Sequence, residues 1–140
     1  MTSLIPFASC NYPDVDKINA LNSYRGNYTF SSKTYSLSNI DNVYFIINNG
    51  GIVGFVEVEY VNLSIDSPMG VCIFLHELHL APSMQGKSIG FEVITYLLTK
   101  IPVIELVVAN ANLNMNKLVA KFKILRNDPA SDTTYFRITN

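Results

Sequence analysis

The fold of this chain is decided by the stretch Glu77-Leu78-His79-Leu80-Ala81-Pro82-Ser83-Met84-Gln85-Gly86-Lys87-Ser88-Ile89-Gly90, because the hydrophobic period changes within it. The residues that lead into it, Val71 to Leu80, are rich in apolar and β-branched side chains and predict a strand. Apolar residues at helical spacing then predict a helix from about Ser88 to Lys100, namely Ile89, Val93, Ile94, Leu97 and Leu98. The pattern is therefore strand, short glycine-containing loop, helix.

The residues before this stretch predict one helix and one hairpin. A helix is expected over Pro13 to Arg25, with an apolar stripe of Val15, Ile18 and Leu21. A polar connection over residues 26–42 follows. Two apolar, β-branched runs at residues 43–47 and 52–61 then flank Asn48-Asn49-Gly50-Gly51, which predicts a turn between two antiparallel strands. In the second run, Val56, Val58 and Tyr60 alternate with Glu57 and Glu59, so we expect one buried face.

The residues after the stretch continue the alternation of strands and helices. We expect a strand over Val103 to Ala109, a helix containing Met115, Leu118, Val119 and Phe122, a turn over Arg126 to Ser131 and a last strand over Thr133 to Thr139. A further turn is expected at Asp66 to Gly70. This order predicts a mixed α/β (α+β) sheet in one domain over residues 1–140, antiparallel in its first half and with a parallel crossover through the helix at 88–100.

Composition and charge exclude several classes of protein. The chain has 140 residues, 49% of them apolar and 15% charged, which is typical of a globular domain. A net charge of −1 argues against nucleic acid or anionic membrane as a partner, because both require a surplus of Lys and Arg. No apolar run approaches the roughly 20 residues that span a bilayer. Without a leader pattern, and with two unpaired cysteines, Cys10 and Cys72, the expected location is cytoplasmic.

The loop over residues 81–90 is the candidate for ligand binding. A loop that leads from a strand into a helix directs successive backbone N–H groups toward one point at the positive end of the helix dipole, which suits a diphosphate. Gly86 and Gly90 allow close approach of a ligand or of neighbouring backbone. An ordinary strand–loop–helix connection has the same composition, so the loop alone leaves both interpretations open.

At these residues the sequence resembles the GNAT superfamily of N-acetyltransferases. The family signature is Gln/Arg-x-x-Gly-x-Gly/Ala, and Gln85-Gly86-Lys87-Ser88-Ile89-Gly90 matches it except that Ser88 replaces the first glycine. The hairpin around residues 49–55 is similar to the family's hairpin into its third strand. Residues 112–124 are similar to the family's late helix, although Val119 replaces its tyrosine and Lys123 its glycine. Heavy use of asparagine is typical of an AT-rich bacterial or phage genome.

The resemblance implies an acetyl-CoA-dependent N-acetyltransferase. Two parallel strands splay apart at the cofactor site, and a primary amine attacks the thioester directly. A backbone N–H on the strand before the loop holds the oxyanion. No metal is implied. The residues that the resemblance places at the cofactor are Leu78, His79, Leu80, Gln85, Gly86, Lys87, Ser88, Ile89, Gly90 and Asn112.

The acid and base of the reaction are less defined by the sequence. His76 and Glu77 are the candidate catalytic bases, since both lie on the strand that faces the thioester in this family. His76, Glu77 and His79 do not predict a zinc site, because residues 76 and 79 of a strand face opposite sides. Val119 cannot donate a proton, which leaves Tyr96, Tyr135 or water for the departing thiolate. Ser88 is expected to cap the following helix, to contact phosphate, or both.

Two other functions compete with this one. A catalytically degenerate GNAT-fold protein would keep a CoA-binding, structural or interaction role. An unrelated α/β domain would carry a chance glycine loop. The expected partner is an amine-bearing small molecule, peptide or protein, and the oligomeric state is open, with a homodimer among the options.

Overall fold

The chain is described here by a computed structural model, which covers residues 2–26, 30, 33–62 and 70–140. The expected turn at Asp66 to Gly70 lies outside the described residues except for Gly70, and so does part of the polar connection at 26–42. The described strands form one seven-stranded sheet in the order β1-β2-β3-β4-β5-β7-β6. This confirms the predicted mixed α/β class.

The chain divides into two compact units. The first unit contains Met1–Glu57 and Glu77–Val93, and the second contains Val58–His76 and Ile94–Asn140. Three elements run from one unit into the other: β3 (Gly51–Asn62), β4 (Val71–Leu80) and α2 (Ile89–Lys100). The single-domain organisation stays a prediction.

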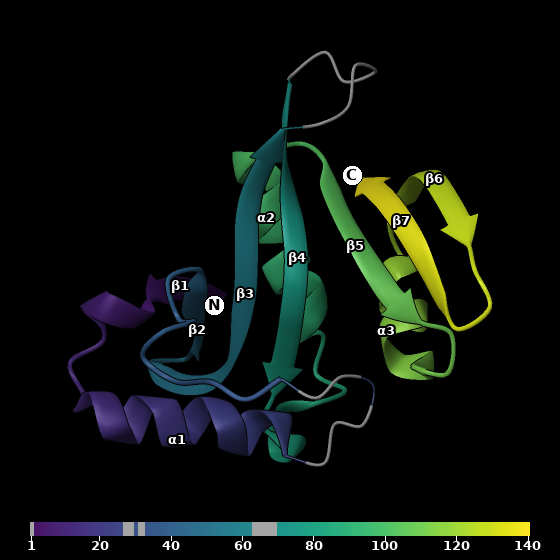
Figure 1. Cartoon of the computed structure of the whole chain (residues 1–140). Coiled ribbons are helices and arrows are strands. Elements are labelled where there is room, and N and C mark those ends of the chain that lie inside the picture. The colour runs from purple at the N-terminus through teal and green to yellow at the C-terminus, as the bar shows by residue number, and fades with distance from the viewer. Residues whose placement is uncertain (1, 27–29, 31–32, 63–69) are drawn as a thin grey trace. The chain divides into compact units, whose positions relative to one another are not determined.

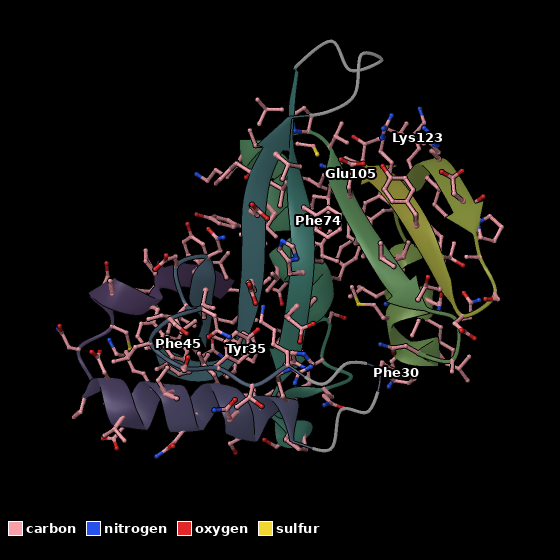
Figure 2. The ribbon with its side chains drawn as sticks, viewed as in Figure 1. Phe30, Tyr35, Phe45, Phe74, Glu105 and Lys123 are labelled. Carbon is pink, nitrogen blue, oxygen red and sulfur yellow. The ribbon has the colours of Figure 1, made fainter. Side chains whose placement is uncertain are left out.

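The first unit packs a helix against an antiparallel set of strands. Its elements, besides the parts of β3, β4 and α2, are β1 (Thr2–Pro6), the short 3-10 helix η1 (Phe7–Ser9), α1 (Asp14–Arg25) and β2 (Val43–Asn48). β2 pairs with β1 on one side and with β3 on the other, and both pairs are antiparallel. Figure 1 shows α1 beside these strands. Leu21 of α1 belongs to the same buried cluster as Phe55 of β3 and Phe45 of β2, which is labelled in Figure 2. The predicted helix and hairpin are confirmed.

The buried stripe of α1 differs from the predicted one. Val15 is exposed, whereas Lys17, Leu21 and Arg25 are buried at a regular four-residue spacing. Lys17 can be buried because its ammonium group donates hydrogen bonds to the carbonyls of Phe7 (2.9 Å) and Cys10 (3.2 Å). Buried cations need such partners, and a pattern of apolar residues cannot reveal them.

The second unit contains the parallel part of the sheet. Its further elements are β5 (Ile104–Ala109), α3 (Leu113–Val119), β6 (Lys123–Pro129) and β7 (Thr133–Thr139), drawn in green to yellow in Figure 1. β5 pairs in parallel with β4 over three residue pairs, from Ile73↔Ile104 to Leu75↔Leu106. On its other side β5 pairs antiparallel with β7, which pairs antiparallel with β6. The predicted strands at 103–109 and 133–139 and the crossover helix are confirmed.

Two strands were not predicted, and one helix is shorter than expected. β1 at Thr2–Pro6 was not expected, and β6 occupies most of the predicted turn at Arg126 to Ser131. Every residue of β6 is exposed, so this edge strand shows no apolar alternation that could identify it. The helix that contains Met115 ends at Val119, and Phe122 is buried beyond its end. Lys123 and Arg126, which follow the helix, lie on β6.

Candidate functional site

The end of β4 is held tightly against β3. The amide of Ala81 donates to the carbonyl of Val53 (2.8 Å), and the rings of Phe55 and His79 lie 5.2 Å apart. A β-carbon built on Gly54 would lie 2.1 Å from the carbonyl oxygen of His79, so no residue larger than glycine fits there without movement of backbone. The contact fixes the backbone of Leu78 to Leu80, which the sequence resemblance placed at the cofactor.

The loop between β4 and α2 contains two residues in the left-handed backbone conformation. The 3-10 helix η2 (Pro82–Met84) comes first, and the Gln85 side-chain amide reaches back to the carbonyl of Leu80 (3.3 Å). Gly86 then has φ +74° and Ser88 has φ +64°. This conformation is costly for a residue with a β-carbon, so the backbone at residue 88 favours glycine, the residue that the GNAT signature has there.

The first turn of α2 leaves donor groups available. The carbonyl of Ser88 accepts the first helical hydrogen bond, from the amide of Glu92 (3.0 Å). Within the described part of the chain, the amides of Ser88, Ile89 and Gly90 have no acceptor in hydrogen-bonding geometry. The expectation that the Ser88 hydroxyl caps the helix stays a prediction. Three adjacent donors at a helix start can bind an anion.

Glu77 of β4 lies in a buried group of charges within the first unit. Its Oε1 accepts hydrogen bonds from Arg25 Nε (2.7 Å) and from His79 Nε2 (3.1 Å), and about 10% of its side chain is exposed. Burial alone raises the pKa of Glu77, but the hydrogen bonds and charges of His79 and Arg25 outweigh it and lower the pKa below its usual value. Glu77 is therefore ionised at neutral pH.

The structure does not bring the two candidate bases together. His76 precedes Glu77 in β4, so their side chains leave opposite faces of the strand. His76 pairs with Glu59 of β3 (2.9 Å) and contacts the ring of Phe74, and it is more exposed than Glu77. His79 is on the same face as Glu77.

A second buried carboxylate belongs to the same unit and was missed. Glu57 was expected on the exposed face of its strand, but it is 7% exposed, whereas Tyr60, expected in the core, is 57% exposed. Glu57 Oε1 accepts from Lys33 Nζ (2.5 Å) and Tyr35 Oη (2.6 Å). The sequence signal was available only in part. The alternation identified two faces of the strand, but it could not show that Lys33 and Tyr35 contact Glu57 on the second face.

Glu57 and Glu77 are neighbours across the two strands. The contacts of Val53 with Ala81 and of Phe55 with His79 define an antiparallel register, which two residues further on puts Glu57 opposite Glu77. Burial, and then the negative charges of Glu57 and Glu77, raise the pKa of the Tyr35 phenol, as expected when both carboxylates are close to it. Lys33 forms an ion pair with Glu57, and Arg25 forms one with Glu77.

The second unit contains three residues that the sequence analysis considered for the site, namely Asn112, Val119 and Tyr135. Asn112 begins α3, where its Oδ1 accepts from the amide of Met115 (3.2 Å). Val119, in place of the family's tyrosine, is 1% exposed. Tyr135, one of the alternative acids, donates its hydroxyl to Glu105 of β5, the residue labelled in Figure 2. Cys72 also donates to Glu105 (2.8 Å).

Two structural features bear on metals and membranes. Among the described residues, no group of three or more His, Cys, Asp or Glu side chains is arranged to hold a metal ion. No described helix is long and apolar enough to cross a bilayer; α1 and α2 have 12 residues each.

Comparisons with known proteins identify the fold. No family model matches the sequence, and no curated protein matches it. Solved structures do match over nearly the whole chain. Arabidopsis thaliana Naa50 in complex with the bisubstrate analogue CoA-Ac-MVNAL has a TM-score of 0.64 at 14% identity, covering 99% of this chain and 98% of that one. A GNAT-family acetyltransferase from Listeria monocytogenes has a TM-score of 0.63 at 11% identity, covering 90% and 87%.

A third similar structure binds a small amine. Diaminobutyrate acetyltransferase EctA from Paenibacillus lautus, in complex with L-2,4-diaminobutyric acid and coenzyme A, has a TM-score of 0.61 at 15% identity and covers 99% of this chain and 95% of that one. The shared feature of these structures is an architecture, because the identities are low. The chain therefore has the fold of the GNAT N-acetyltransferases.

Proposed function

We propose that this protein transfers an acetyl group from acetyl-CoA to a primary amine. The observation that carries the proposal is the row of amides at Ser88, Ile89 and Gly90, which have no acceptor among the described residues, in a chain that matches structures of the GNAT fold over nearly its whole length. In this proposal they bind the diphosphate of the cosubstrate, together with the rest of the loop from Gln85. Lys87, which is exposed on this loop, adds a positive charge.

The end of β4 holds the other part of acetyl-CoA. We propose that the backbone of Leu78, His79 and Leu80 pairs with the pantetheine arm like an added strand, and that one amide there stabilises the oxyanion. Gly54 supports this role, because it lets β3 pack directly against the backbone of His79. The amine nitrogen forms a bond to the acetyl carbon, the carbon–sulfur bond breaks, and CoA leaves as thiolate. Asn112 is the weaker member of the cofactor set, since its side chain caps α3.

A base must take the proton that the attacking amine loses. Glu77 and His76 remain the two candidates, and their surroundings distinguish them. Glu77 is ionised and buried, but Arg25 and His79 both donate to it, which makes it a weak base that acts best through a water. His76 shares its Nε2 with Glu59 and is nearer to solvent. The variants Glu77→Gln and His76→Ala separate them: loss of the base removes the acidic limb of the rate profile against pH, and loss of a structural residue leaves that limb in place.

Two observations favour the alternative of a CoA-binding protein that does not catalyse. Val119 is buried where the family has its tyrosine, and Ser88 takes a glycine's conformation. A CoA-binding protein that no longer catalyses would show both features. Neither feature bears on the rest of the proposal, which is a cytoplasmic, single-domain protein that acts on a small amine, a peptide or a protein.

Two measurements test the proposal in order. Thermal unfolding with acetyl-CoA tests binding, since a ligand at 100 times its Kd stabilises the folded state by about 2.7 kcal/mol. Gly86→Trp should abolish the shift, because it places bulk and strain in the loop at φ +74° while no neighbouring atom lies within 4 Å to be displaced. Release of free thiol with a panel of amines tests transfer. No shift with acetyl-CoA refutes the proposal, and a shift without thiol release favours the non-catalytic alternative.

A further inference from the structure

Lys33 places a primary ammonium group on a buried carboxylate in the first unit. Its Nζ lies 2.5 Å from Glu57 Oε1, and the Glu57 side chain is only 9% exposed whereas the Lys33 side chain is 31% exposed. Lys33 is therefore the more exposed member of the pair, and the Glu57 carboxylate is buried. A buried carboxylate of this kind is costly unless a cation or several donors satisfy it.

Tyr35 completes the surroundings of this ammonium group. Its hydroxyl donates to the same oxygen of Glu57 (2.6 Å), which fixes the carboxylate, and the centre of its ring lies 5.1 Å from Lys33 Nζ. Tyr35 is 2% exposed, so its ring is held by packing. A carboxylate combined with an aromatic face is the arrangement that recognises alkylammonium groups.

The location of this group relates it to the proposed donor site. Glu57 lies opposite Glu77, and Leu78, the next residue of β4, begins the backbone proposed to bind the acetyl-CoA arm. An amine bound at Glu57 would therefore lie about one residue pair from that backbone. This step rests on the proposed function.

We infer that Glu57 and Tyr35 form the acceptor subsite, that it takes a primary alkylammonium group, and that Lys33 of the same chain occupies it in place of the acceptor. Four methylene groups separate the ammonium group of Lys33 from its α-carbon. The acceptor is therefore an unbranched alkylamine of similar length, such as a lysine side chain. The acceptor must displace Lys33 and then lose its proton before it attacks. The carboxylate thus selects the amine, and the base of the proposed mechanism removes the proton.

Removal of the lysine side chain tests the inference without any need for turnover. Lys33→Ala leaves a space that n-propylamine fills, since alanine keeps the β-carbon. We expect n-propylamine to raise the Tm of Lys33→Ala saturably and 1-propanol, which has nearly the same size and no charge, to do so much less. Lys33→Met, whose side chain still fills the space, should show no such difference, and neither should Lys117→Ala, which removes an exposed lysine of α3.

Two carboxylate variants in the Lys33→Ala background decide which acid binds the amine. Glu57→Gln should raise the half-saturating concentration of n-propylamine about tenfold or more, since it removes a charged hydrogen-bond partner. Glu59→Gln, two residues along the same strand, should leave it unchanged. If Lys33→Ala does not fold alone, the same comparison is made on its refolded yield with and without the amine. Equal effects of amine and alcohol, or an effect that Glu57→Gln leaves intact, overturn the inference.

The donor site is measured separately in the same variants. The Tm shift with acetyl-CoA should be the same in Lys33→Ala, in Glu57→Gln and in the unaltered protein. If the acetyl-CoA shift is absent throughout, the proposed function fails while the ammonium subsite is still judged by n-propylamine. If the acetyl-CoA shift is present and the amine effect is absent, only the subsite fails.

Discussion

Gly54→Ala is the substitution that most directly tests how β3 supports the proposed donor site. The new β-carbon would lie 2.1 Å from the carbonyl oxygen of His79 and 2.9 Å from the α-carbon of Leu80. Real β-carbons keep at least 3.0 Å, so the strands must separate by about 0.9 Å at this point. Both obstacles are backbone atoms, and no side chain can rotate away to relieve the contact.

The expected cost is that of overpacking a buried site. Such insertions typically destabilise by about 1 to 3 kcal/mol, which for a chain of this length lowers the Tm by roughly 4 to 12 °C. Binding of acetyl-CoA should suffer more than stability does. The displaced backbone is the part proposed to pair with the pantetheine arm, and a misplacement of about 1 Å in a reacting group can cost roughly a hundredfold in rate.

Gly51→Ala is the matched control for this substitution. Gly51 belongs to the same strand, and the nearest atom to its added β-carbon is the carbonyl oxygen of Asn48 at 4.0 Å. Thermal unfolding followed by circular dichroism measures stability, and calorimetric titration with acetyl-CoA well below the Tm measures binding. If Gly54→Ala unfolds at the same temperature as Gly51→Ala, β3 does not pack on β4 as described. If it is destabilised but binds acetyl-CoA normally, the backbone of Leu78 to Leu80 is not the donor site.

Three further predictions follow from strain, charge and burial. Ser88→Gly should raise the free energy of unfolding by about 0.5 to 1 kcal/mol, because glycine accepts φ +64° at no steric cost; chemical denaturation that shows a loss contradicts this. The pKa of Glu77 is lowered in the folded state, so the ionised carboxylate stabilises the fold above the ordinary carboxyl pKa of about 4.3, and this stabilisation is lost as the pH falls through the folded pKa. Denaturation between pH 7 and 2 should therefore show a smaller loss of stability in acid for Glu77→Gln than for the unaltered chain. Equal dependence of the free energy of unfolding on pH in both proteins would contradict this prediction. Burial, and then the hydrogen bond and charge of Glu105, raise the pKa of the Cys72 thiol to about 12, so a thiol reagent at pH 8 should label it in the unfolded but not in the folded protein, as judged by mass spectrometry of the labelled peptide.

The sequence predicted the main elements of the fold because their hydrophobic periods are strong. The helix at Ile89–Lys100 has apolar residues at helical spacing, and the last strand at Thr133–Thr139 alternates with a period of 2. The strands at Gly51–Asn62 and Val71–Leu80 are rich in apolar and β-branched residues. β1 and β6 were missed because strands at a sheet edge need no apolar face of their own. The length of α3 was overestimated because Phe122 is buried from a loop, and a helical spacing of apolar residues does not show where the helix ends.

The candidate site also has one part that the sequence predicts and one part that it does not. The sequence by itself determined the local part, which is the strand, the glycine-containing loop and the helix at residues 77–90, because neighbours along the chain and their backbone preferences fix it. Only the tertiary structure decided the charges around it. Arg25, Lys33, Glu57 and Glu77 are distant along the chain, and their pairing follows from which faces of α1, β3 and β4 are covered. A charged residue in a sequence reads as exposed unless its partner is known, and a partner from another part of the chain is known only after the strands have paired.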